Sequence, residues 1–295
     1  DEGNNPLRRM NLAYMGYVVP LLANGEPGDL QVVRRLLASF ISNNRWAEPG
    51  VFSDVWNNYT VSHRLINLLS GLALYRQAAG APDNAAEREI LEHARFCAAF
   101  IFANLERDLQ FNHLMKNFVA LTAYSAMCEI KPLACAELKT AVPRSIHQNI
   151  LADGGHVERS PMYHILSLLD MRVLAASGLY KDVWQPLLDK AIRQMTTALS
   201  AMTLADGEIT LMNDSWVGEA PAPAAIIADT TLKANRLPLT GDESLRSGGD
   251  SVVFDCGPCG PDENPGHAHA DFLSIETTVA GNRFLVDTGV PTYTA

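Results

Sequence analysis

The pattern of apolar and polar positions divides the chain into two parts of different character. From about residue 30 to residue 203, apolar residues recur at the three- and four-residue spacing of amphipathic helices. The connections between these runs carry Gly, Pro, Asn and Asp, as in AAGAPDN and SGLYKD, which end helices and open turns. We therefore predict helices over residues 30–43, 63–79, 85–105, 113–127, 135–152, 161–177 and 183–202.

Successive helices with short links form antiparallel hairpins, and this series of them predicts an (α/α) toroid or solenoid. After about residue 205 the chain carries short β-like runs bounded by Gly, Asn and Asp, namely GEITLMND, DSVVFDC, FLSIETTV and NRFLVDTG. The last two, joined by Ala280 and Gly281, predict a β-hairpin. Helices first and an antiparallel sheet afterwards indicate two domains of different class.

Composition narrows the function classes. The formal net charge of −10 argues against a nucleic-acid-binding protein, because such a protein would normally present a basic face. No apolar run approaches the roughly 18 residues that a membrane span needs. The chain begins with Asp1 and has no signal-peptide pattern, so we expect that an export signal has been removed or that the chain is a fragment.

The five cysteines do not indicate a disulfide scaffold, because their number is odd and the chain is 295 residues long. Cys256 and Cys259 form a CGPC sequence, which has the spacing of a thioredoxin-like redox site. Such a motif opens a helix after a strand, whereas this one lies in FDCGPCGPDENPG, where Gly and Pro disfavour a helix. We predict a loop with two thiols in preference to a redox centre.

Two polar clusters lie on the helical part of the chain. Asn112 and His113 in FNHLMKN stand at the start of a predicted helix, where Asn also serves as an N-cap, and the two roles can coexist. In ILADGGHVERSPMYH a turn and a Ser160 cap precede the helix at Pro161. The turn and the cap do not explain the density of reactive side chains there, which is typical of a site on a rigid scaffold. These side chains are His156, Glu158, Arg159, Tyr163 and His164.

A third cluster lies in PGHAHADFLSIE (265–276). His267 and His269 are two residues apart and would face the same side of an extended strand. Asp287 lies on the second strand of the predicted hairpin, so His269 and Asp287 could meet at one metal ion. We expect a bend at Pro265–Gly266 or a bulge if these two histidines point in different directions.

Together these segments resemble the heparinase II/III-like family and the related alginate and oligoalginate lyases. The resemblance covers nearly the whole chain and is carried by WNNYTVSHRLINLL (56–69), FNHLMKN (111–117), DGGHVERSPMYH (153–164), NDSW (213–216), PGHAHADFLSIE and FLVDTG (284–289). It implies an incomplete (α/α) toroid of helical hairpins followed by the start of an antiparallel β-sandwich. We assign the toroid to residues 1–204, a linker with the first β segments to 205–247, and a sandwich domain that is unfinished at residue 295 to 248–295.

The resemblance implies a polysaccharide lyase that cleaves a uronic-acid glycan by β-elimination, removing the C5 proton and expelling the 4-O group. It implies that Asn112 neutralises the uronate carboxylate and that His113 is a neighbouring base or charge stabiliser. Tyr163 is implied to be the general acid and, as in some members of the family, also the base. His267 is implied to reach the site from the sheet domain. The candidate substrate-binding residues are Arg64, His156, Glu158, Arg159 and His164.

The same resemblance implies a structural zinc ion held by His269 and Asp287, with a third ligand outside this chain. It further implies an acidic polysaccharide or oligosaccharide as partner and a periplasmic or secreted location, and it leaves a homodimer open. Neither nucleic acid nor a membrane span is expected.

Two other functions remain open at this level. An α/α-toroid glycoside hydrolase would need two carboxylates across its substrate, for which Asp153, Glu158, Asp206 and Asp214 are candidates. A non-catalytic protein of the same fold could instead use its groove to bind a glycan or to dock an assembly partner.

Overall fold

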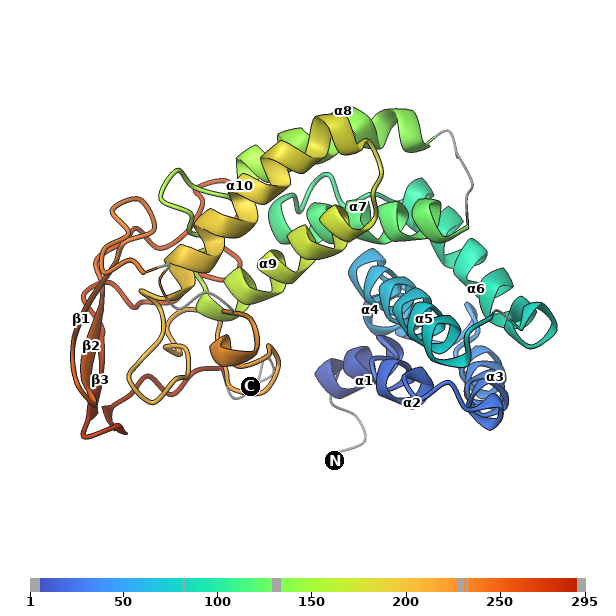
Figure 1. Cartoon of the computed structure of the whole chain (residues 1–295), viewed down its shortest axis with the longest axis horizontal. Coiled ribbons are helices and arrows are strands. Elements are labelled where there is room, and N and C mark those ends of the chain that lie inside the picture. Colours follow the sequence, from blue (N-terminus) through green and yellow to red (C-terminus); the bar gives the residue numbers. More distant parts are fainter. Residues whose placement is uncertain (1–5, 82, 129–133, 228–230, 232, 291–295) are drawn as a thin grey trace. The chain divides into compact units, whose positions relative to one another are not determined.

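A computed structural model describes residues 6–81, 83–128, 134–227, 231 and 233–290. The chain divides into two compact units (Figure 1), one built from residues up to 108 with 116–138, the other from 109–115 with residues 139 onwards. Helices precede an antiparallel sheet along the chain, as predicted. The predicted boundaries at residues 204 and 247 stay a prediction. Residues 291–295, where the sandwich is predicted to stop, lie outside the described residues.

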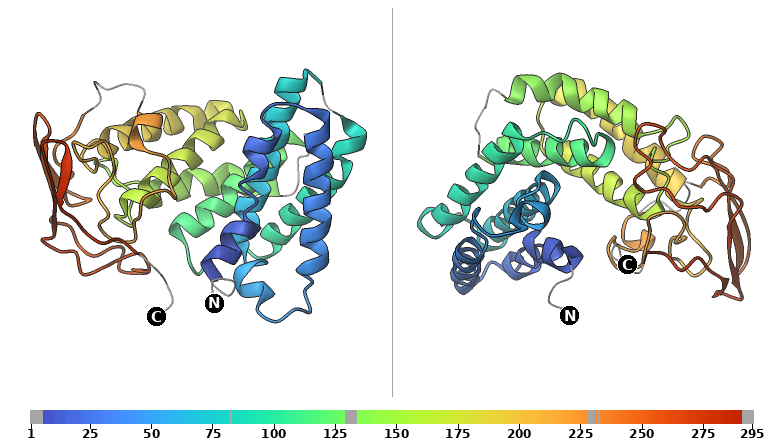
Figure 2. Two further views of the ribbon diagram at one scale, coloured as in Figure 1. Left: turned by 90° about the horizontal axis from the view of Figure 1, so that it is seen from below. Right: turned by 180° about the vertical axis from the view of Figure 1, so that it is seen from behind.

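The described part of the first unit is helical. The predicted helices correspond to α3 (Pro27–Asn43), α5 (Asn58–Ala79), α6 (Asn84–Ala103) and the part of α7 (Phe111–Met127) from residue 116 onwards. Three shorter helices were not predicted, because their few turns show no clear period: α1 (Pro6–Ala13), α2 (Val18–Leu22) and α4 (Val51–Asp54). The long α5 packs against α2 and α6 (Figure 2).

Capping and burial explain α5. The Asn57 side chain accepts a hydrogen bond of 2.8 Å from the Thr60 backbone N–H, and Gly80 ends the helix at a φ of +77°. The face of α5 that carries Leu68 and Leu72 is fully buried in the apolar core of this unit.

The second unit contains the N-terminal turn of α7, α8 (Ala134–Asn149) from residue 139, α9 (Pro161–Ala176) and α10 (Lys181–Leu199), all close to predicted helices. α9 and α10 lie side by side as a hairpin in both views of Figure 2. Among the described residues, no helix is both long and apolar enough to cross a membrane.

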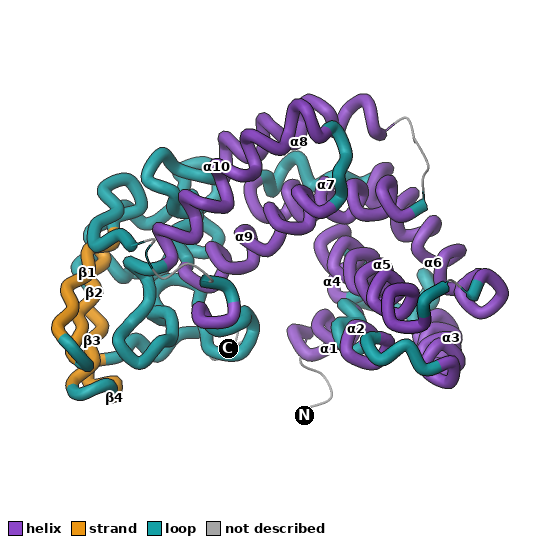
Figure 3. The backbone as a smooth tube through the Cα atoms, viewed as in Figure 1, coloured by secondary structure: helices purple, strands orange, loops and turns teal. Residues whose placement is uncertain are grey.

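A four-stranded antiparallel sheet follows in simple chain order (orange in Figure 3): β1 (Asp242–Ser247), β2 (Asp250–Asp255), β3 (Ile275–Val279) and β4 (Asn282–Leu285). The predicted hairpin is β3–β4, and Ala280 and Gly281 both have positive φ, as a type I′ turn requires. The prediction of a strand over GEITLMND was wrong, because this segment forms turns and only an isolated bridge between Thr203 and Ile209. β1 was missed because DESLRS is mostly polar.

The two faces of the sheet explain this weak signal. One face buries polar side chains, including Asp242, Asp255 and Glu276. The opposite face carries Leu245 and Phe284, which are 69% and 72% exposed in the described part of the chain. Polar residues at the buried positions disguise the period-two pattern that normally reveals a strand. Between β2 and β3 the CGPC motif lies in a loop, as predicted, with both cysteines free and exposed.

Candidate functional site

The DGG turn after α8 is fixed by a carboxylate and two glycines. Asp153 accepts the backbone N–H groups of Leu239 at 2.7 Å and Thr240 at 2.8 Å. Burial acts to raise the pKa of Asp153, but these backbone hydrogen bonds outweigh it and the pKa is lowered. At Gly155 a Cβ would lie 1.7 Å from Thr240 Oγ1, so only glycine fits. The turn therefore presents the following residues from a rigid base.

Ser160 joins the start of α9 to the NDSW turn. Its hydroxyl caps α9 by accepting the Tyr163 backbone N–H at 3.2 Å and donates to the Asp214 carbonyl at 2.8 Å. The Ser215 hydroxyl accepts the Met162 backbone N–H at 3.2 Å. These contacts hold Tyr163 and Asp214 in fixed positions, although they are about fifty residues apart in sequence.

Asn213 connects the loop that carries the two histidines to the same turn. Its side chain accepts the His269 backbone N–H at 3.1 Å and donates to the Arg159 carbonyl at 3.2 Å. The Asp214 backbone N–H donates to the carbonyl of His267 at 3.1 Å. His267 lies in a turn closed by a 3.0 Å hydrogen bond from Ala268 to Pro265, so the predicted bend is confirmed and replaces an extended strand entry.

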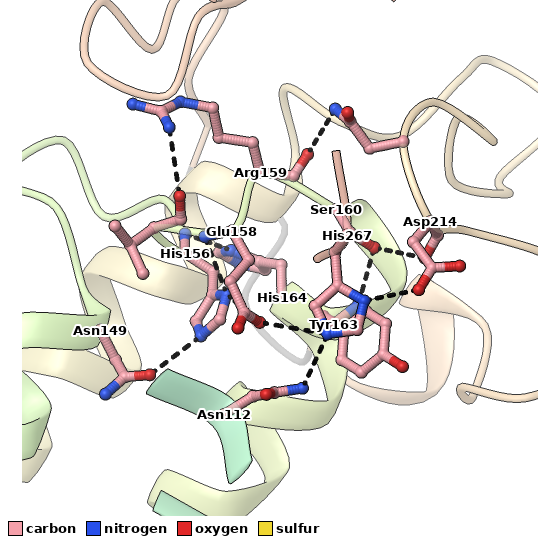
Figure 4. Close-up of polar contacts among 12 residues, drawn as sticks. Asn112, Asn149, His156, Glu158, Arg159, Ser160, Tyr163, His164, Asp214 and His267 are labelled. Carbon is pink, nitrogen blue, oxygen red and sulfur yellow. Dashed lines mark hydrogen bonds and ion pairs between the residues drawn. The ribbon is translucent and has the colours of Figure 1, made fainter. Parts of the chain in front are cut away.

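His267 is the centre of the site (Figure 4). Its Nδ1 lies 2.5 Å from Asp214 Oδ2, and its Nε2 lies 3.4 Å from Asn112 Nδ2 and 4.0 Å from Glu158 Oε2. The Tyr163 ring packs on the imidazole with 3.9 Å between centroids. Burial opposes the charged form of His267, but the hydrogen bond with Asp214 acts against burial, and the pKa of His267 is raised.

This pairing defines what His267 can do. Asp214 accepts the proton on Nδ1, which leaves the Nε2 lone pair to act as a base in the neutral ring. Asn112 stands at the start of α7, where the helix dipole favours an anion. The site thus combines a base, a phenol and an amide donor.

Of the predicted catalytic residues, Asn112, Tyr163 and His267 lie together. His113 lies next to Asn112 in the first turn of α7, near Glu158. Asp214 was named in the sequence only as a hydrolase carboxylate. Its contact with His267 was missed, and the NDSW segment was the available signal.

Four of the five predicted substrate-binding side chains have other partners. The rings of His156 and His164 are fully buried and hydrogen-bonded, and burial lowers their pKa values to about 3 and about 4. The Arg159 guanidinium points away from His267 (Figure 4) and donates to the carbonyls of Leu239 and Thr240. It lines a separate pocket of about 500 Å³ beside the CGPC loop.

Arg64 belongs to the first unit. Its guanidinium is fully buried, 4.5 Å from the ring centroids of both Phe40 and Trp56, and it donates to the Val55 carbonyl. Stacking between two aromatic rings accounts for this arginine as a core residue. It offers no surface to a substrate in this structure. Glu158, the fifth candidate, is buried beside His267.

Three of the carboxylates considered for a hydrolase each have a different structural partner. Asp153 holds the 239–240 backbone, and Asp206 forms an ion pair with Arg283 at 2.8 Å. The Asp214 carboxylate is paired with the His267 side chain. The described residues therefore offer none of these three as a free acid.

The predicted metal ligands are His269 and Asp287. His269 is half-buried and held through its backbone, and Asp287 accepts the Gly289 N–H at 2.8 Å. In the described ranges no group of three or more His, Cys, Asp or Glu side chains is arranged to hold a metal ion. The zinc site stays a prediction.

Comparison with known proteins found a matching family model and several solved structures of similar fold. Residues 229–295 match the model of the heparinase II/III-like C-terminal family. This C-terminal stretch is heparinase II/III-like in its sequence. The fold of the chain resembles that of heparinase III, with a TM-score of 0.70 at 15% identity, covering 96% of this chain and 50% of that one. It also resembles a mutant of heparan sulfate lyase HepC from Pedobacter heparinus, with a TM-score of 0.61 at 18% identity, covering 99% of this chain and 51% of that one.

These likenesses confirm the predicted fold class, a helical-hairpin toroid followed by an antiparallel β domain. A curated relative, FtsZ-localized protein C of Caulobacter vibrioides, is 29% identical over 163 residues, which are 54% of this chain and 28% of that protein. The heparinase-like chain thus spans about half the length of the solved lyases and about a quarter of the length of the curated relative.

Proposed function

We propose that this heparinase-like protein is a polysaccharide lyase that cleaves a uronic-acid glycan by β-elimination. The observation that carries the proposal is the contact of His267 with Asp214, Asn112 and Tyr163 within one unit. The family match and the lyase fold support it.

The chemistry explains the residue types. The C5 proton of a uronate is weakly acidic, so the negative charge that builds on the carboxylate as the proton leaves must be stabilised by a donor. The Asn112 amide, at the start of α7, supplies that donor. His267 takes the proton at Nε2 while Asp214 holds Nδ1, and the Tyr163 hydroxyl protonates the departing 4-O oxygen.

In this proposal His269 and Asp287 would hold a zinc ion, which would brace the loop bearing His267. The donor set fits, because imidazole and carboxylate are both zinc ligands and Asn213 fixes the His269 backbone. The ion would supply rigidity, and ligands other than these two residues would complete its coordination shell. Metal analysis of the purified chain tests this assignment: zinc that is lost in His269→Ala supports it, and a metal-free folded protein contradicts it.

An acidic glycan as substrate is supported by the Asn112 amide donor, the N-terminus of α7 and the likeness to lyase folds. Polymers of this kind lie outside the cytoplasm, so a periplasmic or secreted location is part of the proposal. A homodimer stays a prediction.

A non-catalytic role is the second candidate. It is favoured by the curated relative, whose name states localisation with FtsZ and whose identity of 29% exceeds the 15–18% of the lyases over a shorter stretch. In that case the site would be retained for docking and not for turnover.

The absorbance of the reaction product distinguishes a lyase from a non-catalytic protein. The chain is incubated with heparan sulfate, alginate and other uronate polymers, and absorbance of the unsaturated product is followed. We expect a signal on at least one polymer, and its loss in Tyr163→Phe with substrate affinity retained. A folded chain that yields no unsaturated product on any uronate polymer contradicts the lyase.

A further inference from the structure

Glu158 is a buried carboxyl group with few hydrogen-bond donors around it. Its exposure is 3%. It accepts the Asn112 backbone N–H at the start of α7, while its Oε2 has no hydrogen-bond partner among the described residues. A buried carboxylate normally gathers several donors or a close cation, because it has lost its hydration. Glu158 therefore lacks the surroundings of a charged group.

The imidazole of His156 turns a lone pair toward this oxygen. Asn149 Nδ2 donates to the Ser145 carbonyl at 2.7 Å, so Asn149 Oδ1 is the acceptor for His156 Nε2–H at 3.3 Å. His156 Nδ1 accepts the Glu158 backbone N–H at 3.4 Å and so carries no proton. The ring is neutral, in agreement with the burial that lowers the pKa of His156 to about 3.

The distances from Glu158 Oε2 to the two nearest imidazole nitrogens are long enough for Oε2 to carry a proton. Oε2 lies 3.6 Å from His156 Nδ1 and 4.0 Å from His267 Nε2, so neither contact is a hydrogen bond. His267 is already paired with Asp214 at 2.5 Å. An ionised Glu158 would place a second buried negative charge beside Asp214 and would face the lone pair of His156. The titratable groups around Glu158 are His156, His113, His267 and Asp214.

We propose that Glu158 is an uncharged carboxylic acid in the folded protein, with its proton on Oε2 between the rings of His156 and His267. In this form it positions Asn112 through the α7 backbone without repelling an anion at the same helix terminus. This second part rests on the proposed function, because only an anionic substrate makes the missing charge useful. Burial, the largest influence on Glu158, raises its pKa, which agrees with the neutral form.

The test is the pH dependence of stability in the whole chain, comparing wild type with Glu158→Gln, which keeps the shape and is always neutral. A folded state that keeps the Glu158 proton above pH 4.3 or so loses stability as pH rises, because the unfolded chain releases that proton. We expect the ratio of the two unfolding equilibrium constants to change in favour of the variant by up to about tenfold per pH unit until the folded Glu158 ionises. Glu263→Gln, at an exposed glutamate of the same unit, is the matched control.

A ratio that does not change with pH, or that changes in favour of wild type, overturns the proposal. If the variant does not fold, the carboxyl ¹³C resonance of Glu158 in the wild-type protein replaces it. A protonated-carboxyl shift at pH 7 supports the neutral acid, and a carboxylate shift contradicts it. Neither measurement uses a glycan, so the protonation state of Glu158 can be determined even if the lyase proposal fails.

Discussion

At the scale of single residues, the account depends on the Asp214–His267 pair. Asp214 has 1% exposure and no role in the sequence-based lyase prediction, yet it fixes the tautomer of His267. Asn112, Tyr163 and His267 could be predicted from their segments. Their mutual contacts could not, because Asn112 and His267 are 155 residues apart and no local pattern encodes such a distance.

Substituting Asp214→Asn tests this pair. The amide keeps the size of the side chain but can donate to Nδ1, which favours the tautomer with the proton on Nε2, where the base is needed. We expect turnover of a cleaved glycan to fall by roughly 10²–10⁴-fold, in line with the loss of an orienting aspartate elsewhere. Initial rates and thermal unfolding are measured together.

The matched control is Asp206→Asn, because Asp206 pairs with Arg283 and does not contact His267. It should lose far less turnover than Asp214→Asn. Equal rates for wild type and Asp214→Asn, with both folded, would remove Asp214 from the account.

At the scale of elements, the helices could be predicted well and the first strand could not. α5 and α9 carry caps and long apolar periods that are visible in the sequence. β1 instead buries Asp242 and Ser244, directly opposite Asp255 and Val253 of β2. Buried polar residues invert the expected alternation, so the physical reason for the miss lies in a sheet face that only the folded unit shows.

Asp242 makes the stability of the sheet depend on pH. Burial, then the charges of Asp255 and Asp153, raise the pKa of Asp242 to about 7. Between the unfolded value of about 3.9 and this value, the folded state keeps a proton that the unfolded state has lost, so the native state loses stability as pH rises through that window.

The variant Asp242→Asn removes that loss. Its free energy of unfolding relative to wild type should rise between pH 4 and pH 7 by up to roughly 1.4 kcal/mol per pH unit and then level off. Urea denaturation at pH 4, 5.5, 7 and 8 measures it, with the exposed Asp262→Asn as control. A difference that stays constant across these pH values would mean that Asp242 is charged in the fold.

At the scale of the whole molecule, the two units must be considered separately. The candidate catalytic contacts lie in the second unit, whereas Arg64, predicted from the SHRLINLL segment to bind substrate, is a core residue of the first. Sequence resemblance indicated a family and predicted the fold class. It could not tell which of several polar side chains face a ligand and which complete a core, because both uses favour the same residue types.

The central claim is β-elimination. The most direct test is whether an oxygen atom from water enters the products when the glycosidic bond is cleaved. A uronate oligosaccharide is incubated with the chain in H₂¹⁸O, and the products are weighed by mass spectrometry. Elimination uses no water in bond cleavage, so we expect an unsaturated non-reducing end and no ¹⁸O introduced by the cleavage itself, with product formation lost in His267→Ala. Saturated products that carry ¹⁸O from the cleaved bond would identify a hydrolase and contradict the account.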